Sequence, residues 1–272
     1  KKIKKKKLMQ IISVINQKGG VGKTTTVINL AAGLSQINKK ILIIDLDPQG
    51  NATTGLGLSN LDQSHNSIYQ VLSNTKKIED SISKTKYTNL DIITSNVDLS
   101  GLEVETADDG RRAYILSEKL TAYLNNSKGS YDYVLIDCPP SLSLLTVMAL
   151  VASHSLLVPL QTEFFALEGI TQLIKTIDRI KVGLNPDLSI RGILLTMYDK
   201  RNKLSREVET EARNYFKDKV YKNVVPRNVR LSEAPSHGMP VIFYDKSCPG
   251  SKSYLNFMEE FLAQEESFVT AA

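Results

Sequence analysis

Short apolar runs alternate with longer amphipathic stretches along most of this chain. The apolar runs are nearly continuous in Ile, Leu and Val, which is typical of parallel strands buried on both faces. We predict strands at residues 10–15, 41–45, 90–94, 133–137, 155–160, 191–197 and 241–244.

The amphipathic stretches between these runs predict helices. They cover residues 24–37, 111–124 and 166–180, and the last places Leu167, Ile170 and Leu173 on one side. Repeated alternation of strand and helix predicts an α/β fold, a doubly wound, mostly parallel sheet with helices on both faces. Residues 46–87 are rich in Gly, Asn, Ser and Thr, so we expect loops and short helices there.

The distribution of charge predicts the boundaries of the folded body. The net charge is +5, but six of the 34 basic residues lie in the first seven positions, and the other 28 face 29 acidic residues. We therefore interpret residues 1–8 as a basic flexible tail, with salt-sensitive attraction to polyanions. We expect a single folded domain at 9–265 and a C-terminal tail at 266–272.

The composition argues against several classes of protein. No apolar run reaches the roughly 18–20 residues that a membrane span needs. Cys138 and Cys248 lie far apart, which fits a reducing cytoplasm and argues against a disulfide framework. The three histidines are scattered along the chain, so a protein-held transition metal is not expected.

A glycine-rich loop between the first strand and the first helix predicts a phosphate site. Its sequence, QKGGVGKTT, approaches the pattern G-x-x-x-x-G-K-[ST], with Gln17 in place of the first glycine. Glycines let backbone N–H groups converge on phosphate oxygens, and the following helix directs its positive end at the anion. We predict ATP binding by Lys18, Gly19, Gly20, Val21, Gly22, Lys23, Thr24 and Thr25.

Carboxylates at two other strand ends supply candidates for the remaining chemistry. Asp137 ends a buried strand and is suited, with the Thr24 hydroxyl, to hold Mg²⁺. Cys138 follows where many P-loop ATPases have a glutamate that orients the attacking water. Asp45 and Asp47 are the alternatives: one could serve Mg²⁺ or anchor the loop while the other orients the water. A site without its strongest base should hydrolyse ATP slowly.

These motifs belong to a longer set that together spans about residues 10–261. They are QKGGVGKTTT (17–26), DLDPQGNATTGLG (45–57), DYVLIDCPPSL (132–142), TEFFALEGI (162–170), LLTMYDK (194–200) and VPRNVRLSEAPSHGMPV (225–241). With them the sequence resembles the deviant Walker A ATPases, and within these the ParA/Soj partition proteins. It is similar to the short form, because no helix-turn-helix domain precedes the P-loop.

The resemblance implies a reaction cycle for chromosome or plasmid partitioning. Such proteins bind ATP and Mg²⁺, form a face-to-face homodimer, and then bind DNA without sequence preference. A ParB-type protein on a centromere-like site stimulates weak ATP hydrolysis and so releases them. The expected location is the cytoplasm, in association with the nucleoid and not with a membrane.

The resemblance also implies roles for single residues. Lys18 matches the signature lysine that contacts the nucleotide of the other subunit, and Lys23 and Thr24 match the loop residues of the same subunit. Asp47 matches the hydrolytic aspartate, and Asp137 matches the Walker B aspartate. The expected catalytic residues are then Lys18, Lys23 and Asp47, and the expected metal-site residues are Thr24, Asp47 and Asp137. Met197, Pro226 and Arg227 lie in segments that resemble the adenine-contacting region.

A basic region near the C-terminal third is the candidate DNA surface. Residues 191–230 contain eleven basic and five acidic residues in a body that is otherwise slightly acidic. Such a patch can neutralise phosphates without reading bases, although a solvated helix face has the same composition. The resemblance favours Arg201 and Arg230 as phosphate contacts.

The same fold has three alternative functions, each with its own sequence requirement. A membrane-cycling ATPase like MinD would need a basic amphipathic C-terminal helix, whereas the polar side of residues 254–268 is acidic. An electron-transferring ATPase like the nitrogenase iron protein would need more cysteines than two. A metabolic kinase or synthetase would need a signature for an acceptor substrate, and the sequence has no clear one.

Overall fold

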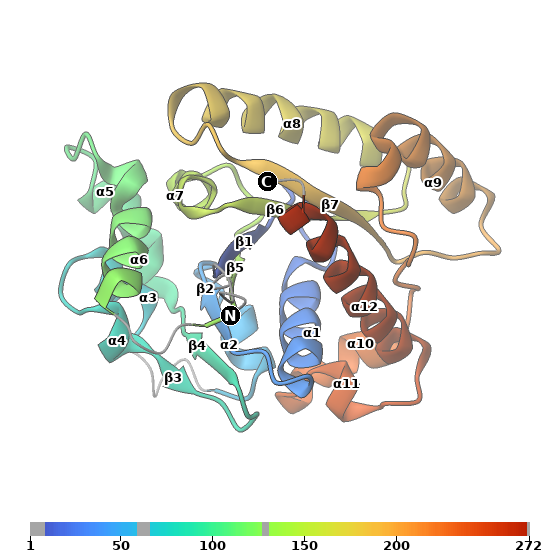
Figure 1. Cartoon of the computed structure of the whole chain (residues 1–272), viewed down its shortest axis with the longest axis horizontal. Helices are drawn as coiled ribbons and strands as arrows, with labels where there is room; N and C mark the ends of the chain where they lie inside the picture. Colours follow the sequence, from blue (N-terminus) through green and yellow to red (C-terminus); the bar gives the residue numbers. More distant parts are fainter. Residues whose placement is uncertain (1–8, 59–65, 127–130, 271–272) are drawn as a thin grey trace, which may run out of the picture.

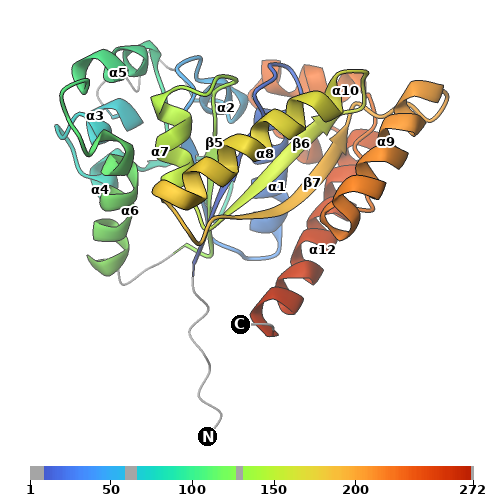
Figure 2. The same cartoon turned by 90° about the horizontal axis from the view of Figure 1, so that it is seen from above.

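The computed structural model describes residues 9–58, 66–126 and 131–270, with side chains described up to Glu265. The predicted basic tail at 1–8 therefore lies outside the described residues. Within the described parts the chain folds around one large sheet with helices on both sides (Figure 1, Figure 2). The predicted fold class is confirmed.

Seven strands form this sheet, in the order β3-β4-β2-β5-β1-β6-β7. Every strand pair is parallel except β3 with β4. The strands are β1 (Gln10–Val14), β2 (Ile41–Asp45), β3 (Ser83–Lys84), β4 (Leu90–Ile93), β5 (Tyr133–Asp137), β6 (Ser155–Gln161) and β7 (Ser189–Thr196). Because β1 lies between β5 and β6, the loops that follow these three strands meet at one edge of the sheet.

Helices cover both faces of the sheet. One face carries α1 (Lys23–Gln36), α11 (Val241–Tyr244) and α12 (Pro249–Thr270), and the other carries α6 (Ile115–Asn126), α7 (Leu144–Ala152) and α8 (Ala166–Gly183) (Figure 1). The remaining helices are α2 (Asn51–Gly55), α3 (Ile68–Leu72), α4 (Ile78–Ser81), α5 (Leu102–Glu105), α9 (Lys203–Phe216) and α10 (Val229–Glu233). The described residues also form four short 3₁₀ turns: η1 (Val97–Gly101), η2 (Arg112–Tyr114), η3 (Lys217–Lys219) and η4 (Ala234–His237).

The apolar runs are continuous because successive side chains of a central strand pack on opposite faces of the sheet and both faces are covered by helices. In β2, Ile41 and Ile43 pack in the cluster with α1 and α12, while Leu42 and Ile44 pack in the cluster with α6 and α7. Successive side chains of a strand point to opposite faces, so a strand covered on both sides needs apolar residues at every position. The same requirement holds for residues 133–136 of β5, which are apolar and buried, and the strand ends in the buried Asp137.

Two features of the sheet differ from the sequence prediction. Residues 241–244 form the helical turn α11 rather than a strand, since Pro240 starts the turn and accepts the N–H groups of Phe243 and Tyr244. A run of only four apolar residues has no periodicity that separates strand from helix. The edge strand β3 was not predicted, because its two residues, Ser83 and Lys84, carry no apolar pattern.

The C-terminal helix α12 is part of the core. Tyr254, Phe257 and Phe261 on it are fully or almost fully buried and belong to the cluster formed with α1. The guanidinium of Arg191 in β7 lies 3.9 Å from the centre of the Phe261 ring. The helix ends at Thr270, so it includes most of the predicted tail at 266–272. Among the described helices, none combines the length and the hydrophobicity that crossing a membrane requires.

Candidate functional site: the P-loop edge of the sheet

The glycine-rich loop joins β1 to α1 at the carboxyl edge of the sheet. Gly20 and Gly22 have φ angles of 76° and 90°, a region that residues with a Cβ rarely adopt. Gly22 is the N-cap of α1, which begins at Lys23. Gly19 and Gly20 are exposed, so the start of a 14-residue helix and its free N–H groups face an open loop. This is the geometry of an anion site at a helix N-terminus.

Two polar side chains hold this loop against the neighbouring strands. Asn16 donates from Nδ2 to the carbonyl oxygen of Pro159 in β6 at 2.8 Å and accepts the N–H of Lys18 at 2.9 Å. Thr196, the last residue of β7, donates its hydroxyl to the carbonyl oxygen of Val21 at 2.9 Å. These hydrogen bonds fix both halves of the loop to the neighbouring strands β6 and β7.

The two loop lysines have different environments. Lys23 is buried, and its Nζ donates to the carbonyl oxygen of Lys18 at 3.0 Å. Burial lowers the pKa of Lys23, and the nearby Asp137, Cys138 and Asp47 partly offset this effect. The Lys18 side chain is 52% exposed and forms an ion pair with Glu163, in the loop after β6. Lys23 thus belongs to the interior of the loop, whereas Lys18 lies at its surface.

The Asp137 carboxylate at the end of β5 fits a magnesium site. It is fully buried, and neither of its oxygens accepts a hydrogen bond within the described residues. Burial raises its pKa well above the ordinary value, Asp45 and Asp47 add to the rise, and the nearby Thr24 hydroxyl and Lys23 ammonium partly offset it. A buried carboxylate without a partner is costly. A hard cation bound by oxygen ligands would satisfy it, with Thr24 beside it.

Asp45 and Asp47 have different environments, which separate the loop anchor from the candidate for orienting the attacking water. Asp45 lies beside Asp137 in the register of β2 and β5 and is fully buried. Its Oδ2 accepts the N–H and the hydroxyl of Thr53, at 2.8 and 2.7 Å. Burial raises its pKa to about 6, partly offset by these bonds to Thr53. Of the two alternatives left open by the sequence, Asp45 fits the loop anchor.

Asp47 lies two residues beyond the anchor, in the turn that leads into α2. Its N–H donates to Asp45 Oδ1 at 3.3 Å, and its own Oδ1 accepts the N–H of Gln49 at 3.0 Å. It lies close enough to Lys23 and Asp137 to influence the pKa of each. Cys138 is buried, and burial raises its pKa to about 12, so it remains a thiol at neutral pH. Asp47 therefore fits the water-orienting role better than its neighbours.

The segments expected to contact adenine come together beside β7. Tyr198 forms a parallel bridge with Pro226, and the N–H of Arg227 donates to the Tyr198 carbonyl oxygen at 3.2 Å. Met197, directly after β7, has a φ angle of 50°. A methionine in this left-handed region is strained, and such residues concentrate at binding sites. Met197, Pro226 and Arg227 thus meet at one place on the carboxyl edge.

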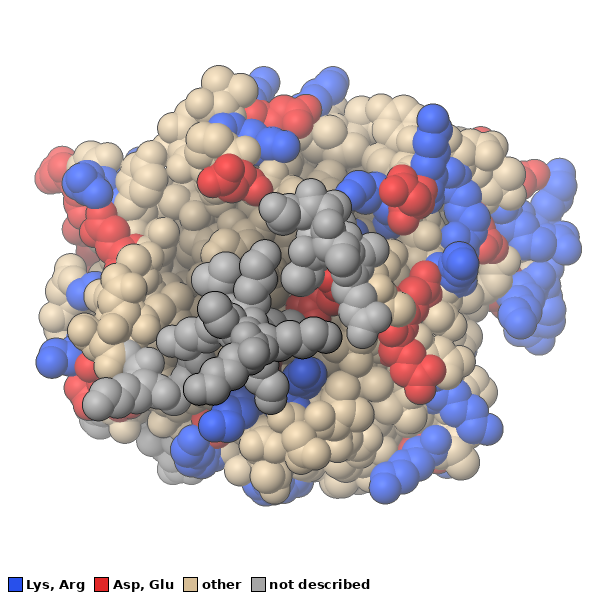
Figure 3. Space-filling view, viewed as in Figure 1, with Lys and Arg blue, Asp and Glu red and all other residues tan. Residues whose placement is uncertain are grey.

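The two candidate DNA residues both have acidic neighbours. Arg201 is 91% exposed and pairs with Asp199 at 3.2 Å. Arg230 is half-exposed and pairs with Glu233 at 2.7 Å and with Asp245 at 3.5 Å. Figure 3 shows basic side chains gathered on the side of the molecule where α9 lies, with acidic ones between them. Their phosphate contacts would have to compete with these local pairs.

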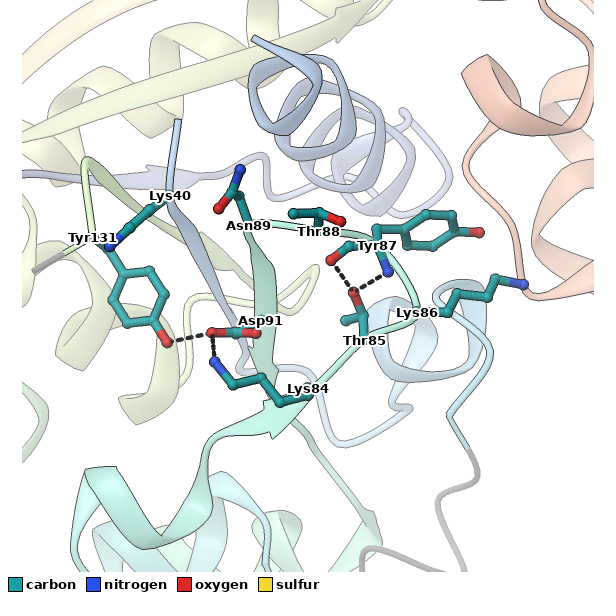
Figure 4. Close-up of a pocket in the computed structure, with 9 residues that line it drawn as sticks. All are labelled: Lys40, Lys84, Thr85, Lys86, Tyr87, Thr88, Asn89, Asp91 and Tyr131. Carbon is teal, nitrogen blue, oxygen red and sulfur yellow. Dashed lines mark hydrogen bonds and ion pairs between the residues drawn. The ribbon is translucent and has the colours of Figure 1, made fainter. Parts of the chain in front are cut away.

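A polar cavity of about 360 Å³ lies at the opposite edge of the sheet (Figure 4). Its centre is Asp91, whose Oδ2 accepts from Lys84 Nζ at 2.6 Å and from the Tyr131 hydroxyl at 2.7 Å. Lys40, at the start of β2, lines the same cavity. The negative charge of Asp91 partly offsets the positive charge of the lysines that line the cavity. The P-loop lies at the opposite, carboxyl ends of the strands. This cavity is therefore separate from the nucleotide edge.

Three residues that support the site were not predicted from the sequence. Glu163 contacts Lys18, Thr53 satisfies Asp45, and Thr196 holds the P-loop. All three lie in quoted motifs or next to them, but their partners are between 8 and 175 positions away in the chain. A local sequence pattern cannot predict contacts between residues so far apart in the chain.

Comparison with known proteins identifies the family of this chain. A family model described as "AAA domain" matches residues 9–190. The chain is 50% identical over 257 residues to the chromosome partitioning protein ParA of Caulobacter vibrioides, covering 94% of this chain and 95% of that protein. It is 48% identical over 254 residues to the sporulation initiation inhibitor protein Soj of Bacillus subtilis, covering 93% and 98%.

Solved structures share the fold over nearly the full chain. A cobyrinic acid a,c-diamide synthase of Mycobacterium smegmatis, with a bound ATP analogue and magnesium, has a TM-score of 0.81 and 32% identity, covering 96% of this chain and 97% of that one. The septum site-determining protein MinD of Pyrococcus horikoshii, complexed with Mg-ADP, has a TM-score of 0.74 and 25% identity, covering 93% and 96%. The chain belongs to the ParA/Soj family of chromosome-partitioning ATPases, with the P-loop fold.

Proposed function

We propose that this protein is an ATP-dependent switch that pairs with a second copy of itself and then binds DNA. The observation that carries the proposal is the division between the two loop lysines. Lys23 is buried in the loop, where it would contact the β- and γ-phosphates of its own nucleotide. Lys18 is at the surface of the same loop, where it could reach a nucleotide held by another copy. A cation supplied in trans couples nucleotide state to pairing.

The other site residues have roles in binding and hydrolysis. Thr24 and Asp137 would hold Mg²⁺, which would supply positive charge to offset the triphosphate. Asp47 accepts a hydrogen bond from the attacking water and directs it at the γ-phosphate. Met197, Pro226 and Arg227 contact the adenine. Since no glutamate follows Asp137, unstimulated hydrolysis is slow.

Binding to DNA follows from pairing. Arg201 and Arg230 contribute sequence-independent phosphate contacts, although their acidic neighbours make each one weak. Two copies double the number of phosphate contacts. Because the contacts are linked, the affinity of the pair for DNA exceeds the affinity of either copy alone. A ParB-type partner would stimulate hydrolysis and end the DNA-bound state. The location that fits this cycle is the cytoplasm, on the nucleoid.

Filter binding or fluorescence anisotropy with one DNA duplex tests this proposal. The affinity is measured with ADP, with ATP and with a non-hydrolysable ATP analogue, at fixed salt because phosphate contacts depend on salt. The proposal expects affinity at least tenfold higher with the two triphosphates. Equal affinity in all three nucleotide states would refute the switch.

A membrane-cycling function like that of MinD is the second candidate, and the fold likeness to MinD favours it. The described part of α12 argues against it. Its large apolar residues Phe257 and Phe261 are buried in the core, so they are not available to enter a bilayer. Pelleting with liposomes that contain anionic lipid, with ATP and Mg²⁺, decides between the two functions. ATP-dependent sedimentation with the liposomes would support membrane cycling.

A further inference from the structure

Two adjacent phenylalanines lie exposed beside the P-loop. Phe164 and Phe165 are 74% and 65% exposed, and their rings contact each other edge to face with centroids 5.0 Å apart. They follow Glu163, the residue that pairs with Lys18. Large aromatic side chains exposed as a pair are uncommon on a surface that stays in water, and they usually mark a contact site.

A third exposed apolar residue lies on the other side of the same loop. Leu142, in the loop after β5, is 44% exposed. This loop touches the P-loop, since a Cβ on Gly19 would lie 3.9 Å from the Cβ of Pro140. In the sheet, β5 and β6 are the two neighbours of β1. Apolar side chains therefore flank the exposed Lys18 on both sides.

We infer that Phe164, Phe165 and Leu142 form an apolar rim that packs against a second copy of this chain and excludes water from the paired nucleotide sites. The inference rests on the proposed ATP-dependent pairing. A second copy is the occupant that fits, because the rim flanks Lys18, the loop lysine whose side chain is exposed. In a two-fold pair each rim would meet the partner's copy of the same face.

By excluding water, the rim would strengthen the contact between Lys18 and the triphosphate in addition to providing apolar packing. Contacts between a lysine and a triphosphate are much stronger in a medium of low dielectric constant than in water. An apolar border that closes only when two copies meet would strengthen the contact made by Lys18 at that moment. Pairing would thus depend more strongly on the triphosphate with the rim than it would with Lys18 alone.

Fluorescence of a single tryptophan tests this inference, because the chain contains none. Phe164→Trp is made in an Asp47→Ala background, which is expected to hold ATP without turnover. With ATP and Mg²⁺ the emission maximum should shift to shorter wavelength, and the shift should grow with protein concentration. The matched control is Val182→Trp, which is 89% exposed near the far end of α8, roughly 25 Å away along the helix. Its emission should not change.

Sedimentation of serine variants gives a second readout. Phe164→Ser with Phe165→Ser should raise the dissociation constant of the ATP-bound pair at least tenfold, Leu142→Ser should raise it less, and Val182→Ser should leave it unchanged. Binding of fluorescent ADP, which needs no second copy, reports whether each variant is folded. If the parent Asp47→Ala chain, without further substitution, stays monomeric with ATP, the proposed function and the rim are both overturned. A parent that pairs, with unshifted F164W emission and an unchanged dissociation constant for the double serine variant, overturns the rim alone.

Discussion

The Nζ of Lys23 donates a hydrogen bond of 3.0 Å to the backbone carbonyl oxygen of Lys18. The two lysines are five positions apart, and this bond joins the interior of the loop to its exposed start. When a triphosphate enters, Lys23 can exchange this carbonyl for phosphate oxygens without moving far. The Lys18 side chain takes no part in this bond, so the two lysines can be tested separately.

Lys18→Ala should therefore remove pairing and leave nucleotide binding. A single copy of the chain would still hold ATP through Lys23 and the N-terminus of α1, so the affinity for a fluorescent ATP analogue should stay within about threefold. The ATP-dependent increase in mass, measured by light scattering, should disappear. Lys23→Ala is the contrasting variant and should lower nucleotide affinity at least tenfold. Equal loss of nucleotide affinity in both variants would contradict the division of roles.

Asp47→Ala should abolish turnover while the protein still binds ATP. The side chain is close to Lys23 and Asp137, and its loss removes the acceptor that orients the water. Phosphate release over an hour, with and without DNA, measures the effect, and a fall of at least 10²-fold is expected. Asp47→Asn is the isosteric comparison. Wild-type turnover in either variant would assign the hydrolytic role to another residue.

Thr53→Val should destabilise the protein through the buried Asp45. The Thr53 hydroxyl donates to Asp45 Oδ2 at 2.7 Å and accepts the N–H of Ser95 at 3.1 Å. Valine keeps the shape but removes both hydrogen bonds. Loss of a hydrogen bond to a buried carboxylate costs about 1.5–3 kcal/mol. Urea denaturation at pH 7.5 measures this, and Thr54→Val, at an exposed neighbouring position, is the control. A cost at Thr53 no larger than at Thr54 would contradict the anchor role of Asp45.

Lys217→Gly should stabilise the fold. Lys217 ends α9 with φ 50° and ψ −121°, a conformation that glycine adopts without strain. Relief of backbone strain of about 1–3 kcal/mol exceeds the entropic cost of glycine, so a net gain of about 1 kcal/mol is expected. Lys217→Ala removes the same charge but keeps a Cβ, and it should give no gain. If alanine stabilises as much as glycine in urea denaturation, the effect comes from charge and not from the backbone.

Arg230→Glu should weaken DNA binding and leave ATP binding unchanged. The substitution removes a cation and places a third carboxylate beside Glu233 and Asp245. The control is Lys175→Glu on α8, an exposed position with the same change of charge. DNA affinity with a non-hydrolysable analogue should fall at least fivefold for Arg230→Glu and by less than twofold for the control. Parallel loss of ATP affinity would assign Arg230 a structural role.

The parts of the site that could be predicted are those that a local pattern encodes. The P-loop is specified by consecutive residues, and the strands that end in Asp45 and Asp137 are specified by apolar runs. Other features are not encoded by a local pattern, such as the contact of Glu163 with Lys18 and the strained backbone at Met197. The acidic neighbours of Arg230 belong to the same class, since Asp245 is brought to it only by the fold. The strand predicted at 241–244 was wrong, because its four apolar residues fit a strand or a helical turn equally well.

The oligomeric state of the Asp47→Ala chain with nucleotide tests the central claim most directly. Sedimentation velocity is measured at micromolar protein with saturating ATP and Mg²⁺, with ADP and Mg²⁺, and without nucleotide. The account predicts a pair with ATP only and a single copy in the other two samples. A chain that remains single with ATP, or that pairs equally well with ADP, would contradict it.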